Sequence, residues 1–186
     1  MKRKDIFEII KIGLILFAIT AVSAGILAAV NSVTEPIITA NEETKRREAM
    51  TKVLPGADAF EKIEFTDENS SVTEAYSAGG EGYVILAEPR GYSSDISIVV
   101  GILPDLTVNS IDITSQSETP GLGANCINEE FMSSFSGKTK DIKVVKSNPT
   151  ANQIDALSSA TVTSKAVVRG VNDALAAAEI LMGGDK

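Results

Sequence analysis

Hydrophobic residues are concentrated in one uninterrupted run close to the amino terminus. No charged residue lies between Lys11 and Glu35, and within residues 12–30 the only polar side chains are those of Thr20 and Ser23. An α-helix of this length covers roughly 28 Å, close to the hydrocarbon thickness of a bilayer. The run therefore predicts a single transmembrane helix over residues 12–30.

The flanks of this run distinguish an anchor from a cleaved signal peptide and indicate its orientation. Residues 2–4 are basic and residues 21–29 include small residues, as in a signal peptide, but the apolar run is longer than a signal peptide needs. A retained anchor is favoured. Residues 1–11 carry four basic and two acidic side chains, whereas the first charge beyond the run is Glu35. This excess of positive charge predicts a cytoplasmic amino terminus and an extracytoplasmic domain.

Beyond the run, the pattern predicts a helix followed by a series of strands. The helix covers residues 34–52, with Pro36 near its start and Pro55-Gly56 after its end. Five segments rich in β-branched and aromatic residues follow, separated by glycine and proline turn signals: residues 60–65, 72–77, 83–87, 96–103 and 106–114. Their spacing of about ten residues predicts consecutive antiparallel strands.

The remaining third of the chain predicts a short helix over residues 128–136, a strand over 142–146 and a long helix over 164–182. The long helix has apolar residues at three-to-four spacing, so one stripe packs on the sheet: Val167, Val168, Val171, Leu175, Ala178 and Leu181. The predicted fold class is α+β, with a mainly antiparallel sheet and flanking helices. We expect a tail (1–11), a transmembrane helix (12–30), a juxtamembrane helix and turn (31–58) and one extracytoplasmic domain (59–186).

Composition excludes several kinds of chemistry. Histidine is absent and Cys126 is the only cysteine, so the chain by itself forms no histidine-ligated zinc site, Cys₄ cluster, c-type haem site or histidine-based triad. Redox chemistry would need an organic cofactor. A net charge of -8 argues against nucleic acid as a partner, and the predicted exported part is more acidic still. We expect Cys126 to be a buried small residue rather than a reactive thiol.

Two segments have residue patterns that packing into a hydrophobic core does not explain. The first is Ser-Glu-Thr-Pro-Gly-Leu-Gly-Ala at residues 117–124, where two glycines flank Leu122 after Pro120. Such a loop lets the backbone approach a ligand closely, although it is neither a dinucleotide fingerprint nor a P-loop. By composition alone, a plain turn is the simpler interpretation.

The second segment is Asp-Ala-Leu-Ser-Ser-Ala-Thr-Val-Thr-Ser at residues 155–164, directly before the last helix. Its five hydroxyl side chains crowd a helix amino terminus, where unpaired amides and the helix dipole attract phosphate. Helix capping explains one such hydroxyl group, so capping alone is an incomplete but open alternative.

The two segments together resemble a known family. Residues 118–123 followed by Asp-x-x-Ser-x-Ala-Thr at 155–161 are similar to the FMN-binding domain of the G subunit of the Rnf electron-transport complex, which is related to the C subunit of the sodium-pumping NADH:quinone reductase. The turn at residues 53–57 and the single predicted span extend the resemblance over nearly the whole chain.

This resemblance implies a covalent flavin. In the family, a threonine at the end of the second motif carries FMN through a phosphoester bond that a separate flavin transferase forms, and the matching residue is Thr161. Serine stands at 159 where the family pattern has glycine, which is tolerable unless the backbone there needs a positive φ. The resemblance further implies flavin ring and ribityl contacts by Glu118, Thr119, Gly121, Leu122 and Gly123, and phosphate contacts by Ser158, Ser159, Ala160 and Thr163.

The function implied is that of a membrane-anchored electron-transfer subunit. It would act with the other subunits of a complex that moves electrons between ferredoxin and NAD⁺ and couples this flow to export of Na⁺ or H⁺. The chain itself lacks a dinucleotide fingerprint and an intramembrane charge, so it would be a non-autonomous part of that translocase. Two alternatives remain: a component of another respiratory flavoprotein assembly, or a colourless, non-catalytic, membrane-anchored binding module.

Overall fold

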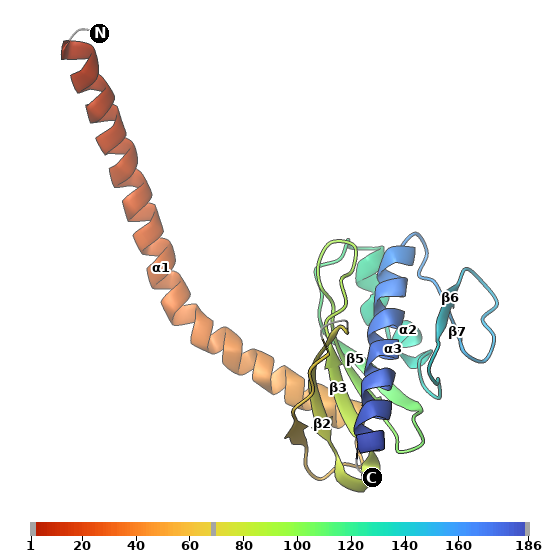
Figure 1. Ribbon diagram of the computed structural model, residues 1–186. Helices are drawn as coiled ribbons and strands as arrows, with labels where there is room; N and C mark the ends of the chain where they lie inside the picture. Colours follow the sequence, from red (N-terminus) through yellow and green to blue (C-terminus); the bar gives the residue numbers. More distant parts are fainter. Residues whose placement is uncertain (1–2, 68–69, 185–186) are drawn as a thin grey trace. The chain divides into compact units, whose positions relative to one another are not determined.

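The computed structural model describes residues 3–67 and 70–184 (Figure 1). The chain divides into two units, Met1–Thr44 and Lys45–Lys186. The fold class predicted from the sequence is confirmed: an apolar amino-terminal helix is followed by an antiparallel sheet with flanking helices.

The apolar run forms the first part of a single long helix, α1 (Arg3–Val53). Its large apolar side chains between Ile10 and Ile38 are at least half exposed, and by length and composition the helix qualifies as a membrane span. Pro36 lies inside α1 and does not begin a second helix, contrary to the prediction. A proline removes one backbone donor from a helix, and a helix of this length retains the hydrogen bonds on either side.

Five strands form one antiparallel sheet in the order β1-β2-β3-β4-β5, as the sequence predicts. Their bounds are β1 (Glu61–Ile63), β2 (Val72–Ser77), β3 (Tyr83–Ala87), β4 (Ser97–Ile102) and β5 (Val108–Ser115). The register places Ala75, Ile85, Val100 and Ile111 in one row across the sheet. All four are buried on one face because side chains alternate along a strand.

The last helix, α3 (Thr161–Gly184), covers that face. Its predicted apolar stripe is confirmed, because Val167, Val171 and Leu175 are buried in the same cluster as the row. The opposite face carries Val84 and Val99, which pack with Met50, Val53 and Leu54 at the end of α1. The sheet is therefore covered on both faces within the second unit.

The end of α1 is also fixed by polar contacts. The Val53 carbonyl accepts hydrogen bonds from Asn109 Nδ2 at 2.7 Å and from Ser110 Oγ at 3.2 Å. A Cβ at Gly101 would lie 2.3 Å from that carbonyl oxygen, so the helix end approaches the sheet at a residue without a side chain. These contacts satisfy a carbonyl group that the helix itself leaves unpaired.

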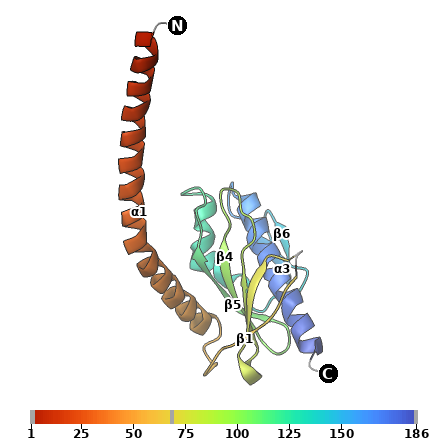
Figure 2. The same ribbon diagram turned by 60° about the vertical axis from the view of Figure 1, so that its left-hand side comes forward.

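Smaller elements complete the domain: η1 (Gly79–Glu81), η2 (Gly123–Ile127), α2 (Glu129–Ser133), β6 (Lys143–Val145) and β7 (Gln153–Asp155). The sequence did not predict β7, which pairs with β6 in parallel. Three residues give too short a pattern to recognise. Figure 1 and Figure 2 both place the β3–β4 loop, η2 and the amino-terminal end of α3 at the same end of the domain.

Candidate functional site

The amino terminus of α3 brings the second sequence motif into a defined shape. Thr161 is the first helical residue and is half-buried. Ser164 is buried, and its hydroxyl accepts a hydrogen bond from the Leu157 amide at 2.9 Å and donates to the Ala160 carbonyl at 3.0 Å. This hydroxyl group therefore stabilises the turn that leads into the helix, but it accepts its hydrogen bond from an amide that precedes the helix rather than from a first-turn amide, as a helix cap would.

The other hydroxyl groups of the motif divide into two kinds. Thr163 is 1% exposed and its hydroxyl is bonded to a side chain of the first motif. Ser158 and Ser159 are exposed and Thr161 is half-buried. Among the described residues, nothing bonds to these last three hydroxyl groups, so they remain available at the end of α3 where the dipole favours an anion.

Ser159 has a φ of +59°, the left-handed conformation. Such a conformation costs a non-glycine residue roughly 1–2 kcal/mol. The backbone at residue 159 therefore does need a positive φ, which is the one condition under which serine was not expected to be tolerated. This requirement explains why glycine suits the position. The serine side chain is exposed, so the cost comes from the backbone conformation and not from packing.

Glu118 joins three segments that are distant in the sequence. Its side chain is buried, with 5% exposure. One carboxylate oxygen, Oε2, accepts a hydrogen bond from Thr163 Oγ1 at 2.5 Å, while Oε1 accepts bonds from the amides of Ser93 at 2.8 Å and Ser94 at 3.3 Å. The carboxylate thus connects the β3–β4 loop, the first motif and the first turn of α3.

Two glycines make room for this carboxylate. A Cβ at Gly123 would lie 2.6 Å from Thr163 Oγ1, and one at Gly91 would lie 2.6 Å from Glu118 Oε1. Both distances are too short for real atoms. Gly123 was predicted to contact a ligand, but the structure also gives it a packing reason, since any side chain there would separate Glu118 from Thr163.

The rest of the first motif lies at the surface. The Thr119 carbonyl accepts hydrogen bonds from the amides of Leu122 and Ala124, both at 3.1 Å, and Gly121 has a φ of +77°. The loop is thus a tight turn that presents Leu122, which is 40% exposed. Tyr92 in the β3–β4 loop and Val162 in the first turn of α3 are also exposed apolar residues.

The sequence did not predict that residues 91–94 belong to the site. It identified only a turn at Pro89-Arg90-Gly91. The Ser93 and Ser94 amides bind Glu118 through backbone groups, which every residue type except proline has, so no side-chain pattern could reveal the contact. An aromatic residue between a glycine and two serines was the available hint.

The charges in the site follow from these contacts. Burial by itself raises the pKa of Glu118, but the Thr163 hydroxyl and the Ser93 and Ser94 amides outweigh it and hold this pKa below its ordinary value. Glu118 is therefore ionised at neutral pH. Burial, assisted by the Glu118 charge, raises the pKa of the Cys126 thiol to about 11. The prediction that Cys126 is buried is confirmed, and its thiol stays protonated.

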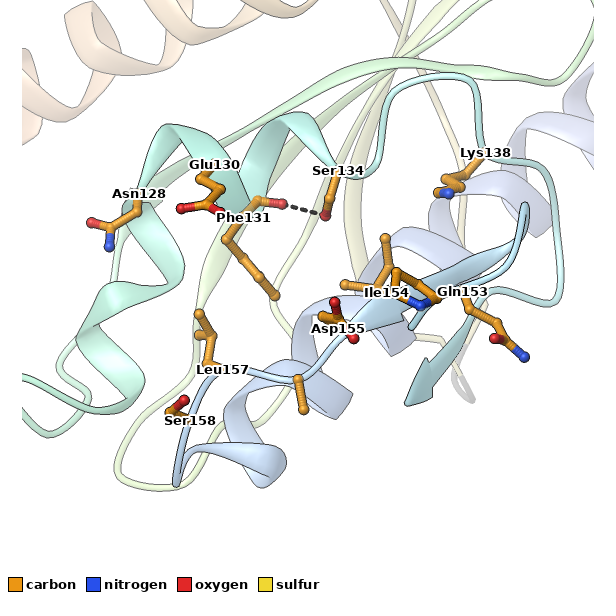
Figure 3. Close-up of a pocket in the computed structure, with 12 residues that line it drawn as sticks. Asn128, Glu130, Phe131, Ser134, Lys138, Gln153, Ile154, Asp155, Leu157 and Ser158 are labelled. Carbon is orange, nitrogen blue, oxygen red and sulfur yellow. Dashed lines mark hydrogen bonds between the residues drawn. The ribbon is translucent and has the colours of Figure 1, made fainter. Parts of the chain in front are cut away.

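A cavity of about 470 Å³ lies beside the second motif, between α2 and the segment that follows β7 (Figure 3). Phe131, Ile154 and Leu157 give it an apolar lining, and Asn128, Glu130, Asp155 and Ser158 contribute polar groups. The Phe131 ring is held edge-on by Phe135, with ring centroids 5.4 Å apart. This volume lies in the range of small-molecule sites.

Comparison with known proteins identifies the class of protein. Residues 91–176 match the model of the FMN-binding domain, and residues 1–53 match that of the RnfG N-terminal region. The first match covers most of the β3–β4 loop, both motifs and most of α3. The chain therefore carries an FMN-binding domain behind an apolar amino-terminal helix.

Individual relatives identify the family. The chain is 33% identical to the G subunit of the proton-translocating ferredoxin:NAD⁺ oxidoreductase complex of Clostridium ljungdahlii, over 88% of each chain. It is 34% identical to the G subunit of the Na⁺-translocating ferredoxin:NAD⁺ oxidoreductase complex of Acetobacterium woodii, also over 88% of each. The chain belongs to the RnfG family, the G subunits of these ion-translocating complexes, as its motifs indicated.

A solved structure supports the fold alone. The crystal structure of Shewanella oneidensis NqrC superposes with a TM-score of 0.55 at 18% identity, over 67% of this chain and 68% of that one.

Proposed function

We propose that the protein is a membrane-anchored electron-transfer subunit of a complex that links ferredoxin and NAD⁺ to the export of Na⁺ or H⁺, and that it carries FMN on Thr161 through a phosphoester bond. The observation that carries the proposal is the position of Thr161. Its hydroxyl has no partner among the described residues and stands at the first turn of a 24-residue helix, in a chain whose domain matches an FMN-binding family.

The surroundings of Thr161 suit a phosphate group. The first amides of α3 lack helical partners, and the Ser158 and Ser159 hydroxyl groups are exposed just before them. Hydrogen bonds from these groups and the helix dipole would offset the charge of a phosphodiester, the dipole by about 0.3–1 kcal/mol. Thr163 would contribute indirectly, because its hydroxyl is committed to Glu118.

When bound, FMN supplies exchange of one or two electrons. The residues of the chain bind and orient it. Glu118 holds the β3–β4 loop and the loop of residues 119–123 against the helix that carries Thr161. A covalent bond keeps the cofactor at a high effective concentration regardless of free flavin outside the cytoplasm.

The membrane arrangement and partners are part of the proposal. Charge beside the span supports a cytoplasmic amino terminus and an extracytoplasmic FMN domain. Partners would be the other subunits of the complex, reached through the anchored helix, and a flavin transferase during maturation.

Mass spectrometry of the full chain co-expressed with a flavin transferase tests the proposal. We expect an FMN adduct on the peptide that contains Thr161 and no adduct in Thr161→Ala. Thr150→Ala, at an exposed threonine outside the motif, should retain full loading. An unmodified wild-type peptide, or an adduct that persists in Thr161→Ala, would contradict it.

A further inference from the structure

We propose that the end of the domain around Thr161 carries a docking surface for a protein partner whose own surface is rich in carboxylates. The docking surface consists of three exposed cations, Arg90, Lys165 and Arg169, beside exposed apolar side chains. This inference rests on the proposed function, which makes the partner another subunit of the complex, and it adds the face through which the two proteins meet.

The three cations come together from two elements that are far apart in the sequence. Lys165 and Arg169 follow Thr161 at intervals of four residues, so all three lie on one side of α3, with successive residues about 6 Å apart along its axis. Arg90 belongs to the β3–β4 loop, and its carbonyl accepts a hydrogen bond from Arg169 Nη2 at 3.0 Å. The three residues are therefore neighbours at the surface.

Packing fixes the closeness of this loop and α3. A Cβ at Gly170 would lie 2.8 Å from Pro89 Cγ, so the start of the loop lies against the helix at a residue without a side chain. Pro89 and Gly170 are both buried. They are the chain neighbours of Arg90 and Arg169, so the backbones that carry the two arginines are held together by the core.

The chain does not neutralise these charges itself. Within the described ranges, no acidic side chain bonds to Lys165 or Arg169, and Asp173, one turn after Arg169, accepts hydrogen bonds from the residue before β2. Arg90 pairs with Asp95 at 3.4 Å, but both side chains are more than half exposed, so this pair contributes little. Like charges four residues apart on a helix repel each other. A cationic group of this kind, in a chain of net charge -8, is complementary to carboxylates on a partner.

Exposed apolar side chains accompany the cations. Beyond Ile38, the large apolar residues that are exposed in the described chain are Tyr92, Leu122, Ile127, Val162 and Ile180. All except Ile180 belong to the β3–β4 loop, to η2 and the residue before it, or to the first turn of α3, and Figures 1 and 2 place these elements at one end of the domain. Protein interfaces combine an apolar centre with a polar rim and are enriched in tyrosine and arginine.

Acidic residues on the other side of this end favour a protein over an anionic bilayer as the partner. Glu129 and Glu130 are exposed in α2, directly after η2. An anionic membrane would repel them, whereas a protein can present carboxylates to Lys165 and Arg169 and other groups to α2. A partner docked on this surface would also lie beside the proposed attachment point of the cofactor, as electron transfer requires.

Carbodiimide cross-linking of the purified complex, which joins an amine directly to a carboxylate, tests the docking surface. We expect peptide mapping to show Lys165 linked to an aspartate or glutamate of another subunit. Lys140 and Glu179, whose charged atoms are 3.1 Å apart, should be linked within the chain and show that the reaction worked. That internal link without a link from Lys165 to another subunit would overturn the inference.

Charge reversal measures what the docking surface contributes. Lys165→Glu/Arg169→Glu and the matched control Lys143→Glu/Lys146→Glu change the net charge equally, all at exposed residues. In the complex, we expect the first double variant to slow electron transfer through the flavin on Thr161 by roughly tenfold at low salt, and the difference to shrink as salt screens the charges. The control should match wild type, and intact mass should show full FMN loading in both.

The outcomes separate this inference from the proposed function. A chain without FMN on Thr161 whose Lys165 still links to another subunit would contradict the proposed function and leave the docking surface intact. A loaded chain with equal rates in both double variants would overturn the docking surface alone. A loss of FMN loading confined to Lys165→Glu/Arg169→Glu would also overturn it, because the cations would then serve the cofactor phosphate. So would an effect seen in phosphatidylglycerol bilayers and not in phosphatidylcholine, which would assign the cations to lipid headgroups.

Discussion

The Thr163 hydroxyl donates a hydrogen bond of 2.5 Å to the buried carboxylate of Glu118, across 45 residues of sequence. This contact joins the two motifs that were recognised separately, and it lies two residues from the proposed flavin attachment at Thr161. The same carboxylate binds the amides of Ser93 and Ser94, so one side chain determines how three segments meet.

Removing either partner of this contact should loosen the site. Thr163→Val leaves the Glu118 carboxylate short of one donor while buried, which costs about 1–3 kcal/mol of unfolding free energy. Chemical denaturation of Thr163→Val, Glu118→Gln and the double variant measures this cost and their coupling. Because the residues interact directly, the two single effects should not add. Strict additivity would show that the hydrogen bond contributes nothing to stability.

Ser159→Gly should stabilise the domain. Ser159 has a φ of +59°, a conformation that glycine adopts without strain, so we expect about 1 kcal/mol of added stability. Loading with FMN should stay the same or improve. Ser158→Gly, at an adjacent exposed residue without a positive φ, should give no such gain. Thermal denaturation and intact mass decide; a marked loss of loading in Ser159→Gly would show a specific role for the hydroxyl.

Gly123→Ala should be damaging despite its small size. Its Cβ would approach Thr163 Oγ1 to 2.6 Å and Glu118 Oε2 to 2.8 Å, so these two side chains would have to separate. Overpacking of this kind costs about 1–3 kcal/mol. Gly80→Ala is the matched control, since a Cβ there meets nothing within 4 Å. Equal stability of both variants in urea would refute the predicted clash.

Stability should fall in acid partly because of Glu118. Its pKa is lower in the folded protein than its ordinary value of 4.5, so folding favours the ionised form. The resulting stability is present above that ordinary value and is lost as the pH falls through the lower, folded-state pKa. The pKa of Glu74, beside Lys62 and Arg46, is lowered in the same direction. Urea titrations from pH 7 to pH 3 should therefore show a shallower decline in Glu118→Gln than in wild type, but not a flat profile.

Much of the fold could be read from local pattern. Strands β2 and β3 were predicted with the same bounds that the structure shows, and the predicted strand over 96–103 contains β4. The alternation of apolar residues and the glycine or proline turn signals are local properties of the sequence. They were therefore sufficient to predict these strands. The single helix through Pro36 and the three-residue strand β7 were missed, because a proline and a very short segment give misleading or weak local signals.

For the site, the sequence by itself determined the chemistry: which hydroxyl groups precede α3, which loop carries the glycines, and the absence of histidine together with a single cysteine, from which we expected an organic cofactor for redox work. Only the tertiary structure decided what those groups are free to do. In the folded protein Thr163 donates a hydrogen bond to Glu118, and Ser164 bonds within the turn before α3. The amides of Ser93 and Ser94 donate to the same carboxylate as Thr163. The Ser164 contacts are local, but the contacts of Glu118 involve backbone amides or residues far apart in the chain, and their geometry exists only once the sheet and α3 have packed together.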